Sequence, residues 1–178
     1  MEPAVQLVVR EADEHRARFG AFCRSLSPTQ LEALVPGSHW RAKDYVAHLA
    51  TIDIWVNDWF EHMAECQPWH PKGEGGAPFN IDDWNEARIR ERYDAAVEDL
   101  LREAAGHRAR LWSTVDRFTP DVLEERFVFR GKEITFLRYL QLWIGHDPAH
   151  SVEMVAAAPE ALDDQEVRRW LGPYLPKA

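Results

Sequence analysis

Three histidines lie where the sequence predicts the buried face of a helix: His48, His146 and His150. His146 and His150 are four residues apart, so both rings project from one side of a helix, the spacing of many metal-ligand pairs. Burying three neutral imidazoles leaves both nitrogens of each ring in need of a partner, and a divalent cation would bind three of them at once. The three residues are therefore candidate metal ligands.

The alternative is that these histidines are core residues, each hydrogen-bonded to backbone, Tyr or carboxylate groups. Pro148 also has two interpretations: it kinks a continuous helix and turns the rings inward, or Asp147-Pro148 begins a new helical segment. Asp147 itself is expected to be an exposed carboxylate, the alternative being that it orients a neighbouring ring.

A site of three imidazoles leaves coordination positions open, as catalytic metal sites do. This donor set favours Zn²⁺ or Ni²⁺, and Mn²⁺ and Fe²⁺ also tolerate imidazole. No obvious general acid or base lies on the apolar stripe of either His-bearing helix, so the catalytic residues stay unassigned.

Three aromatic residues are candidates for the wall of a small-molecule pocket: Trp55, Tyr139 and Trp143. Trp55 follows His48 by seven residues, Trp143 precedes His146 by three, and Tyr139 lies one turn before Trp143. Such rings combine apolar stacking with a polar N–H or O–H group. The competing interpretation is that all three belong to the core.

The pattern of apolar residues predicts the helices that must position these side chains. Spacings of three and four residues indicate amphipathic helices separated by segments rich in Pro and Gly. The predicted helices cover residues 3–26, 40–66, 80–117 and 135–158, and a short last helix covers 161–171. Residues 67–79 are expected to form a long loop, and the alternation over residues 126–135 predicts either a small hairpin or an extended arm. The expected fold is an all-α four-helix bundle in one domain, residues 1–178.

The composition excludes several classes of protein. A formal net charge of −9 lacks the basic surface that nucleic-acid binding requires. No segment approaches the roughly 20 apolar residues of a membrane span, and no signal-peptide pattern is visible. Two cysteines are too few for a disulfide framework and indicate a reducing compartment. We therefore expect a cytoplasmic protein that binds neither nucleic acid nor membranes.

Three motifs, in the same order and spacing, resemble those of the DinB-like family over essentially the whole chain. They are WRAKDYVAHLA at residues 40–50, FNIDDWN at residues 79–85 and GHDPAH at residues 145–150. The resemblance implies an up-down-down-up four-helix bundle, related to the N-terminal domain of mycothiol-dependent maleylpyruvate isomerase. It also places His48, His146 and His150 at the family's three metal-ligand positions.

The resemblance further implies a metal-dependent enzyme that acts on a small molecule. The expected reaction is that of a transferase or isomerase with a low-molecular-weight thiol as second cofactor, or that of a hydrolase. Family members often form dimers, so a homodimer is an additional expectation. Two other functions stay open: a module that holds metal or ligand without turnover, and a structural or dimer-forming bundle whose histidines are satisfied in the core.

Overall fold

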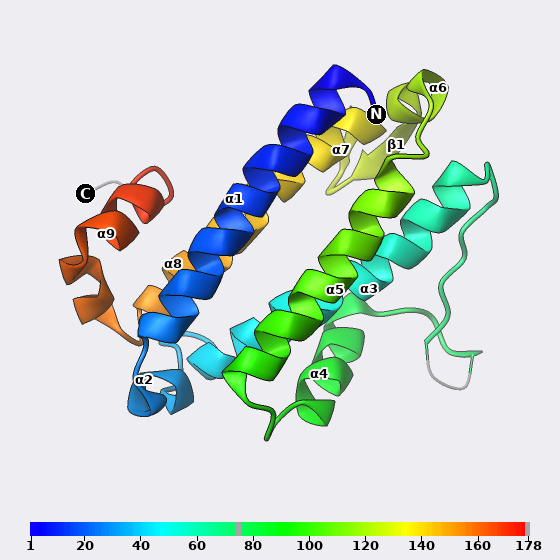
Figure 1. Cartoon of the computed structure of the whole chain (residues 1–178). Helices are drawn as coiled ribbons and strands as arrows, with labels where there is room; N and C mark the ends of the chain where they lie inside the picture. Colours follow the sequence, from blue (N-terminus) through cyan, green and yellow to red (C-terminus); the bar gives the residue numbers. More distant parts are fainter. Residues whose placement is uncertain (74–75, 177–178) are drawn as a thin grey trace. The chain divides into compact units, whose positions relative to one another are not determined.

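The computed structural model describes residues 1–73 and 76–176, and nearly all of its regular structure is helical (Figure 1). Among these residues, no helix is both long and apolar enough to cross a membrane. The chain groups into two compact units: Met1 with Ala47–Phe136 forms the first, and Glu2–Val46 with the segment from Leu137 onward forms the second. The elements, in chain order, are α1 (Pro3–Ser25), α2 (Pro28–Glu32), α3 (Ala42–Ala64), α4 (Ile81–Glu91), α5 (Val97–Val115), α6 (Pro120–Glu124), β1 (Arg126–Phe129), β2 (Lys132–Thr135), α7 (Phe136–Trp143), α8 (His146–Val155), η2 (Pro159–Asp163) and α9 (Gln165–Leu171).

In the first unit, α5 runs parallel to the part of α3 that begins at Ala47 (Figure 1). Side-chain hydrogen bonds join the two helices along their length: Asp53 bonds Arg108, and further along both helices Asn57 bonds Thr114. Because parallel helices begin at the same end, the chain must return along about 28 Å, the length of α5. Residues 65–80 and α4 make this return. They include the loop predicted over 67–79, of which residues 74–75 lie outside the described part of the chain.

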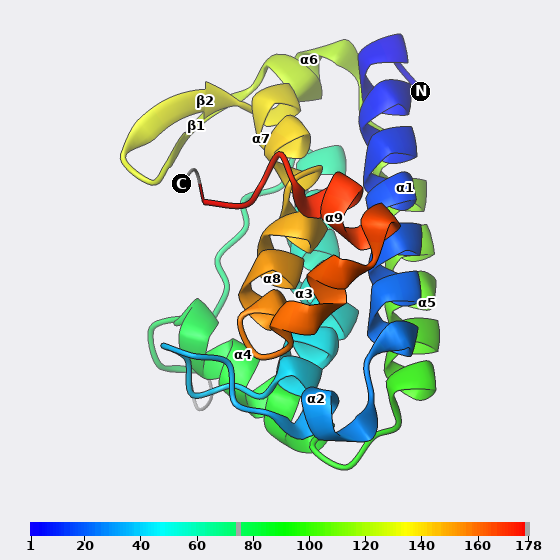
Figure 2. The same cartoon turned by 90° about the vertical axis from the view of Figure 1, so that its left-hand side faces the viewer.

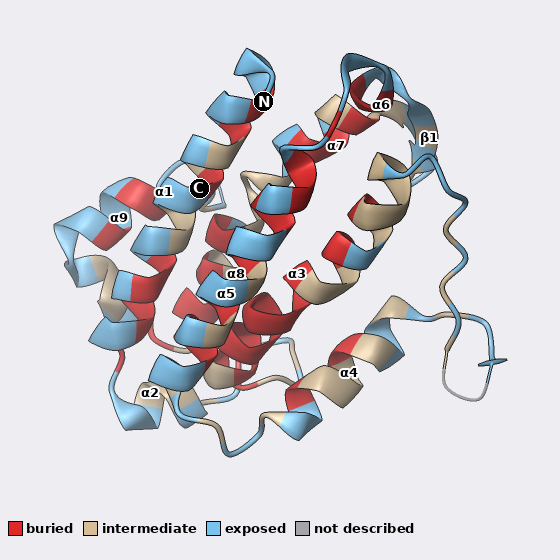
Figure 3. Cartoon of the chain, turned by 45° about the vertical axis from the view of Figure 1, so that its right-hand side comes forward, coloured by how far each residue is buried: buried red, intermediate tan, exposed pale blue. Residues whose placement is uncertain are grey.

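The facing sides of α3 and α5 supply the apolar core of the first unit. Figure 3 shows buried residues along one side of α5 and exposed residues along the other. Leu100 and Leu111 of α5 are buried, as are Val56 and Phe60 of α3. The Phe60 ring lies edge-on to Phe136 with 4.8 Å between the ring centroids. The apolar periodicity therefore predicts these buried faces correctly.

The predicted continuous helix over 80–117 is wrong, because residues 92–96 separate α4 from α5. No Pro or Gly marks the interruption, so the sequence carries no ordinary stop signal there. The Arg92 guanidinium instead bonds the Glu103 carboxylate of α5, with 2.6 Å between Nη2 and Oε1, and this contact joins the two helices. The predicted N-cap of α4 is confirmed, since Asn80 Oδ1 accepts from the Asp82 amide at 2.9 Å.

The hairpin predicted over 126–135 is confirmed (Figure 2). Its turn residues Arg130 and Gly131 both have positive φ, 49° and 75°, as a two-residue turn of type I′ requires. Phe127 of β1 lies edge-on to Trp59 of α3, with the ring centroids 5.2 Å apart. Within the first unit, the hairpin therefore packs against α3 through an aromatic contact.

In the second unit, α1 and the α7–α8 segment run in the same direction, and α9 packs beside α1 and α8 (Figures 1 and 2). The predicted first helix is confirmed as α1, and η2 with α9 takes the place of the short helix predicted at 161–171. The buried apolar residues of α1 recur mainly at spacings of three and four: Val5, Val8, Ala12, Phe19 and Phe22. Each unit therefore contains one pair of parallel neighbouring helices.

The last long predicted helix is two helices, because α7 ends at Trp143 and α8 begins at His146. Pro148 is the third residue of α8 and lacks the N–H group that would bond the Ile144 carbonyl in a continuous helix. Pro is tolerated in the first turn of a helix, where that N–H has no intrahelical partner. Of the two interpretations of Pro148, the start of a new helical segment at Asp147-Pro148 is the one observed.

Candidate functional site

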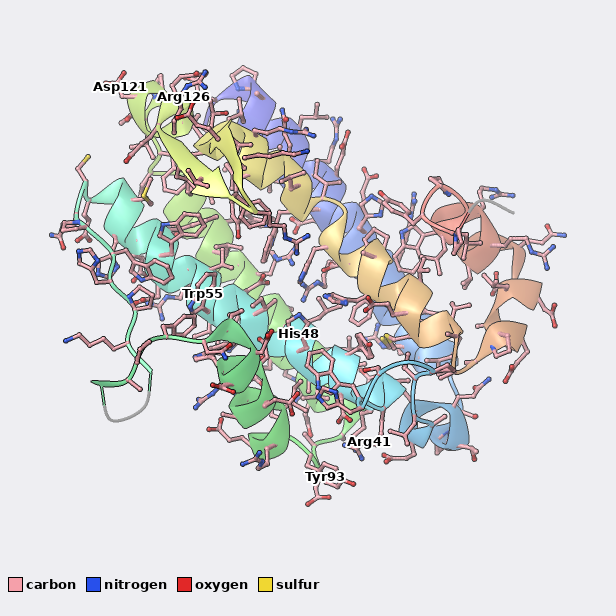
Figure 4. The ribbon with its side chains drawn as sticks, turned by 180° about the vertical axis from the view of Figure 1, so that it is seen from behind. Arg41, His48, Trp55, Tyr93, Asp121 and Arg126 are labelled. Carbon is pink, nitrogen blue, oxygen red and sulfur yellow. The ribbon has the colours of Figure 1, made fainter. Side chains whose placement is uncertain are left out.

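His48 lies on α3 in the first unit, and its side chain is only 4% exposed. Figure 4 shows it on the same helix as Trp55. This stretch of α3 carries other buried polar residues, and each has a partner: the Thr51 hydroxyl donates to the Ala47 carbonyl at 3.0 Å, and Asp53 accepts from Arg108 at 2.7 Å. The predicted burial of His48 is confirmed, and it occurs on a helix face that already accommodates polar groups.

His146 and His150 lie on α8 in the second unit, and both are half-buried. Their ring centroids are 4.7 Å apart, and the ring planes are nearly perpendicular at 85°. One helix therefore presents both rings together, as the four-residue spacing predicts.

The carboxylate of Glu153, which is not among the predicted site residues, hydrogen-bonds one of these rings. His150 Nδ1 lies 2.7 Å from Glu153 Oε2. An ionised carboxylate only accepts hydrogen bonds, so in the neutral ring this bond places the proton on Nδ1 and leaves the lone pair on Nε2. Metal-binding histidines are commonly oriented by such a carboxylate, which also makes the ligand nitrogen more basic. The signal in the sequence was the spacing of three residues between His150 and Glu153.

Aromatic side chains flank the histidine pair within the second unit. The Trp143 ring stacks on His146 with 4.6 Å between centroids and 8° between planes, and Tyr139 lies 6.1 Å from Trp143. Tyr45 lies 5.5 Å from His150, and burial raises the pKa of its hydroxyl above the usual 10.0. Tyr139 and Trp143 thus lie in one row with a candidate ligand, and their role as a pocket wall stays a prediction.

Trp55 has different surroundings in the first unit. Its ring stacks on Phe79 at 5.6 Å and meets Trp69 edge-on at 4.9 Å, both from the connection between α3 and α4. Trp69 also donates from Nε1 to Asp58 of α3 at 2.8 Å. These contacts fasten the connection onto α3, so Trp55 has a packing role, and its predicted role as a pocket wall stays a prediction.

Asp147 is buried, and the expectation of an exposed carboxylate there is wrong. Both of its oxygens accept from the Arg16 guanidinium, at 2.7 Å from Nε and 3.0 Å from Nη2. Sequence reasoning missed this pair because its members are 131 residues apart. The cation on α1 is what allows this carboxylate to be buried beside the histidines.

The model of the DinB superfamily matches residues 11–154. Among solved structures, YfiT from Bacillus subtilis, described as "a probable metal-dependent hydrolase with an unusual four-helix bundle topology", has a TM-score of 0.66 at 16% identity. The alignment covers 97% of this chain and 90% of YfiT. A mycothiol-dependent maleylpyruvate isomerase has a TM-score of 0.62 at 12% identity; the alignment covers 86% of this chain and 63% of the isomerase. No curated protein matches the sequence significantly.

At these identities, the two structural similarities establish the fold alone. They confirm the predicted all-α four-helix bundle, and the predicted family resemblance is confirmed by the model that matches most of the sequence. The chain belongs to the DinB superfamily.

Proposed function

We propose that the protein binds one divalent metal ion through His48, His146 and His150 and acts on a small molecule. The observation that carries this proposal is the hydrogen bond from His150 to Glu153, which leaves Nε2 as the ligand nitrogen beside the ring of His146. The same bond would also satisfy a core histidine, so the metal content measured below separates the two interpretations.

The donor set fits a borderline-soft divalent cation. Three imidazoles suit Zn²⁺ or Ni²⁺ best, while Mn²⁺ and Fe²⁺ are the other candidates. When bound, such a cation would polarise a carbonyl or stabilise a thiolate or hydroxide at neutral pH. The chain's own residues orient the ligands through Glu153, and the ring of Trp143 limits the approach of solvent to His146 by stacking on it.

The reaction class is proposed from the structural neighbours. One is named for its dependence on mycothiol and the other is described as a probable metal-dependent hydrolase. We favour a transferase or isomerase that uses a low-molecular-weight thiol, and a hydrolase is the second choice. Tyr139 and Trp143 would contact the substrate, with Trp55 as a further contact. A cytoplasmic homodimer remains part of this proposal.

The first experiment measures metal content by mass spectrometry on untagged protein purified without chelators. The wild type is compared with His48→Ala and with the double variant His146→Ala/His150→Ala, and His70→Ala in the exposed loop serves as the matched control. We expect about one equivalent of metal in the wild type and the control, and a loss in the other two variants, with unchanged circular dichroism. Absence of metal from the wild type, even after incubation with Zn²⁺ or Ni²⁺, would contradict the proposal.

A second experiment tests turnover separately from binding. Metal-loaded protein is assayed against small electrophiles and esters, with and without a low-molecular-weight thiol. Turnover that requires the thiol would support the transferase or isomerase class, and turnover without it would support the hydrolase. Metal binding without turnover in either assay would favour a binding module.

A further inference from the structure

We infer that Arg16 is a positioning residue for the metal ligands: by holding Asp147 it fixes the first turn of α8, and with it the orientation of the His146 and His150 rings. This inference rests on the metal-binding function proposed above. Arg16 lies on α1 and is not a candidate ligand, so its effect must pass through the backbone of α8.

The contact between Arg16 and Asp147 is bidentate, a fork of two parallel hydrogen bonds. Arg16 Nε and Nη2 each donate to a different oxygen of Asp147, at 2.7 Å and 3.0 Å. The two side chains are 11% and 3% exposed, so water competes little for these groups. A planar guanidinium that bonds both carboxylate oxygens sets the direction as well as the distance of its partner, which a lysine ammonium does not do.

The helix that carries the histidines is short and begins after a turn. α8 has ten residues, is separated from α7 and packs against α1 and α9, and the bond from Arg16 adds a directional contact at its first turn. Each residue turns an α-helix by about 100°, so a rotation of α8 by even a fraction of that angle would move both rings away from a common ion. Asp147 lies between the two histidines, directly after His146, and its fixation therefore constrains both.

Contacts inside α8 transmit this constraint. The Ser151 hydroxyl donates to the Asp147 carbonyl at 2.8 Å, and the Ala149 amide donates to the Gly145 carbonyl at 3.0 Å. These bonds hold the first turn as a rigid unit around Pro148. When Asp147 is fixed from α1, the turn that contains His146 and leads to His150 is fixed with it.

The test compares Arg16→Lys and Arg16→Ala with the wild type. Arg16→Lys keeps the positive charge and removes the bidentate hydrogen bond. It provides a second test if Arg16→Ala does not fold. The matched control is Arg92→Lys in the first unit, which removes a comparable fork to Glu103. Zn²⁺ affinity is measured by competition with a chromophoric chelator, and ligand geometry by the visible absorption of bound Co²⁺.

We expect Arg16→Lys to bind Zn²⁺ about 10-fold more weakly and to alter the Co²⁺ spectrum, because groups behind metal ligands typically change affinity by about 10- to 100-fold. Arg92→Lys should match the wild type in both measurements. A role for Arg16 in stability alone would lower the melting temperature and leave the affinity and the spectrum of the folded protein unchanged. That result would overturn the inference.

A measurement on metal-free protein separates this inference from the proposed function. The ¹⁵N resonances of the His146 and His150 rings report tautomer and orientation without any metal. We expect the wild type to show His150 protonated at Nδ1, and Arg16→Lys to shift the ring signals of both residues. If the wild type binds no metal, the proposed function fails. If the ring signals are the same in Arg16→Lys as in the wild type, the positioning role fails.

Discussion

Each of the two units contains a buried Arg–Asp pair that joins helices far apart in the sequence, yet the two pairs have different surroundings. In the first unit Arg108 Nε donates to Asp53 Oδ2 at 2.7 Å, and the two side chains are 4% and 0% exposed. In the second unit Arg16 bonds Asp147 at the same distance, with slightly more exposure.

The difference lies in the helices that the pairs join. Arg108 and Asp53 lie within the long uninterrupted helices α5 and α3, where Arg108 also packs over the Trp112 ring at 5.2 Å. Asp147 lies in the first turn of the short helix α8. In the first unit the Arg–Asp pair therefore joins two long helices. In the second unit the corresponding pair orients the short helix that carries the candidate metal ligands.

The largest expected effect is that of Asp53→Ala in the first unit. Removal of one member leaves the buried Arg108 charge uncompensated, which typically destabilises a protein by about 3–5 kcal/mol. Urea unfolding followed by circular dichroism measures the change. The exposed pair Arg102–Asp99 supplies the control, since Arg102→Ala should cost less than about 1 kcal/mol. Equal small losses in both variants would contradict this account of the first pair.

Arg16→Ala in the second unit should lower stability by less. Arg16 is more exposed than Arg108, so its truncation opens a path for water to the Asp147 carboxylate, and we expect a total loss of about 1.5–3 kcal/mol. The same unfolding experiment measures the total loss. Hydrogen exchange should show faster exchange of the α8 amides than in the wild type. A loss as large as that of Asp53→Ala, or unchanged exchange in α8, would remove the distinction between the two pairs.

Glu153→Gln changes the hydrogen bond to the candidate ligand His150 and leaves both Arg–Asp pairs intact. The neutral amide holds His150 less strongly, and we expect metal affinity to fall about 10-fold, or about 1.4 kcal/mol. Chelator competition measures this affinity. Glu133→Gln, on the exposed hairpin, is the control and should bind as the wild type does. Unchanged affinity in Glu153→Gln would show that this carboxylate does not support the ligand.

The smallest expected effect is a difference in pH dependence between the units. Burial, assisted by Arg18, lowers the pKa of His15 below 6.5, and the neutral ring accepts from Trp170 Nε1 at 2.8 Å. Because the pKa is lower in the folded state, the unfolded state binds the proton more readily. The contribution of neutral His15 to the free energy of unfolding is therefore complete above pH 6.5 and is lost as the pH falls through the folded-state pKa. In the first unit, hydrogen bonds from arginines lower the pKa values of Glu61 and Glu103 below 4.5, so their contributions are lost only below that pH.

The free energy of unfolding, measured at about pH 7.5 and about pH 5.5, tests the contribution of His15, because histidines are the side chains whose charge changes most in that range. His15→Asn keeps an acceptor for Trp170 and removes the titration. We expect the stability advantage of the wild type over His15→Asn to shrink at the lower pH. An advantage that stays constant would show that His15 does not contribute to the pH dependence.

Much of the fold follows from local patterns in the sequence. Apolar residues at helical spacing predict α1 and α3 to within two residues at each end, and the alternation around Gly131 predicts the hairpin. The interruptions are harder to predict. The break at residues 92–96 has no Pro or Gly, and it coincides with a contact of Arg92 with Glu103, eleven residues away. Pro148 signals the second break, but the sequence alone allows either a kink or a new helix.

The parts of the candidate site that lie within one helix follow from the sequence alone. His146 and His150 face the same way, and Glu153 lies within reach of His150, because residues three and four apart are neighbours on a helix. The burial of Asp147 against Arg16 and the hydrogen bonds between the parallel helices α3 and α5 are seen only in the folded chain. A carboxylate can be buried when a cation pairs with it. For Asp147 that cation is Arg16, which lies 131 residues away in the sequence.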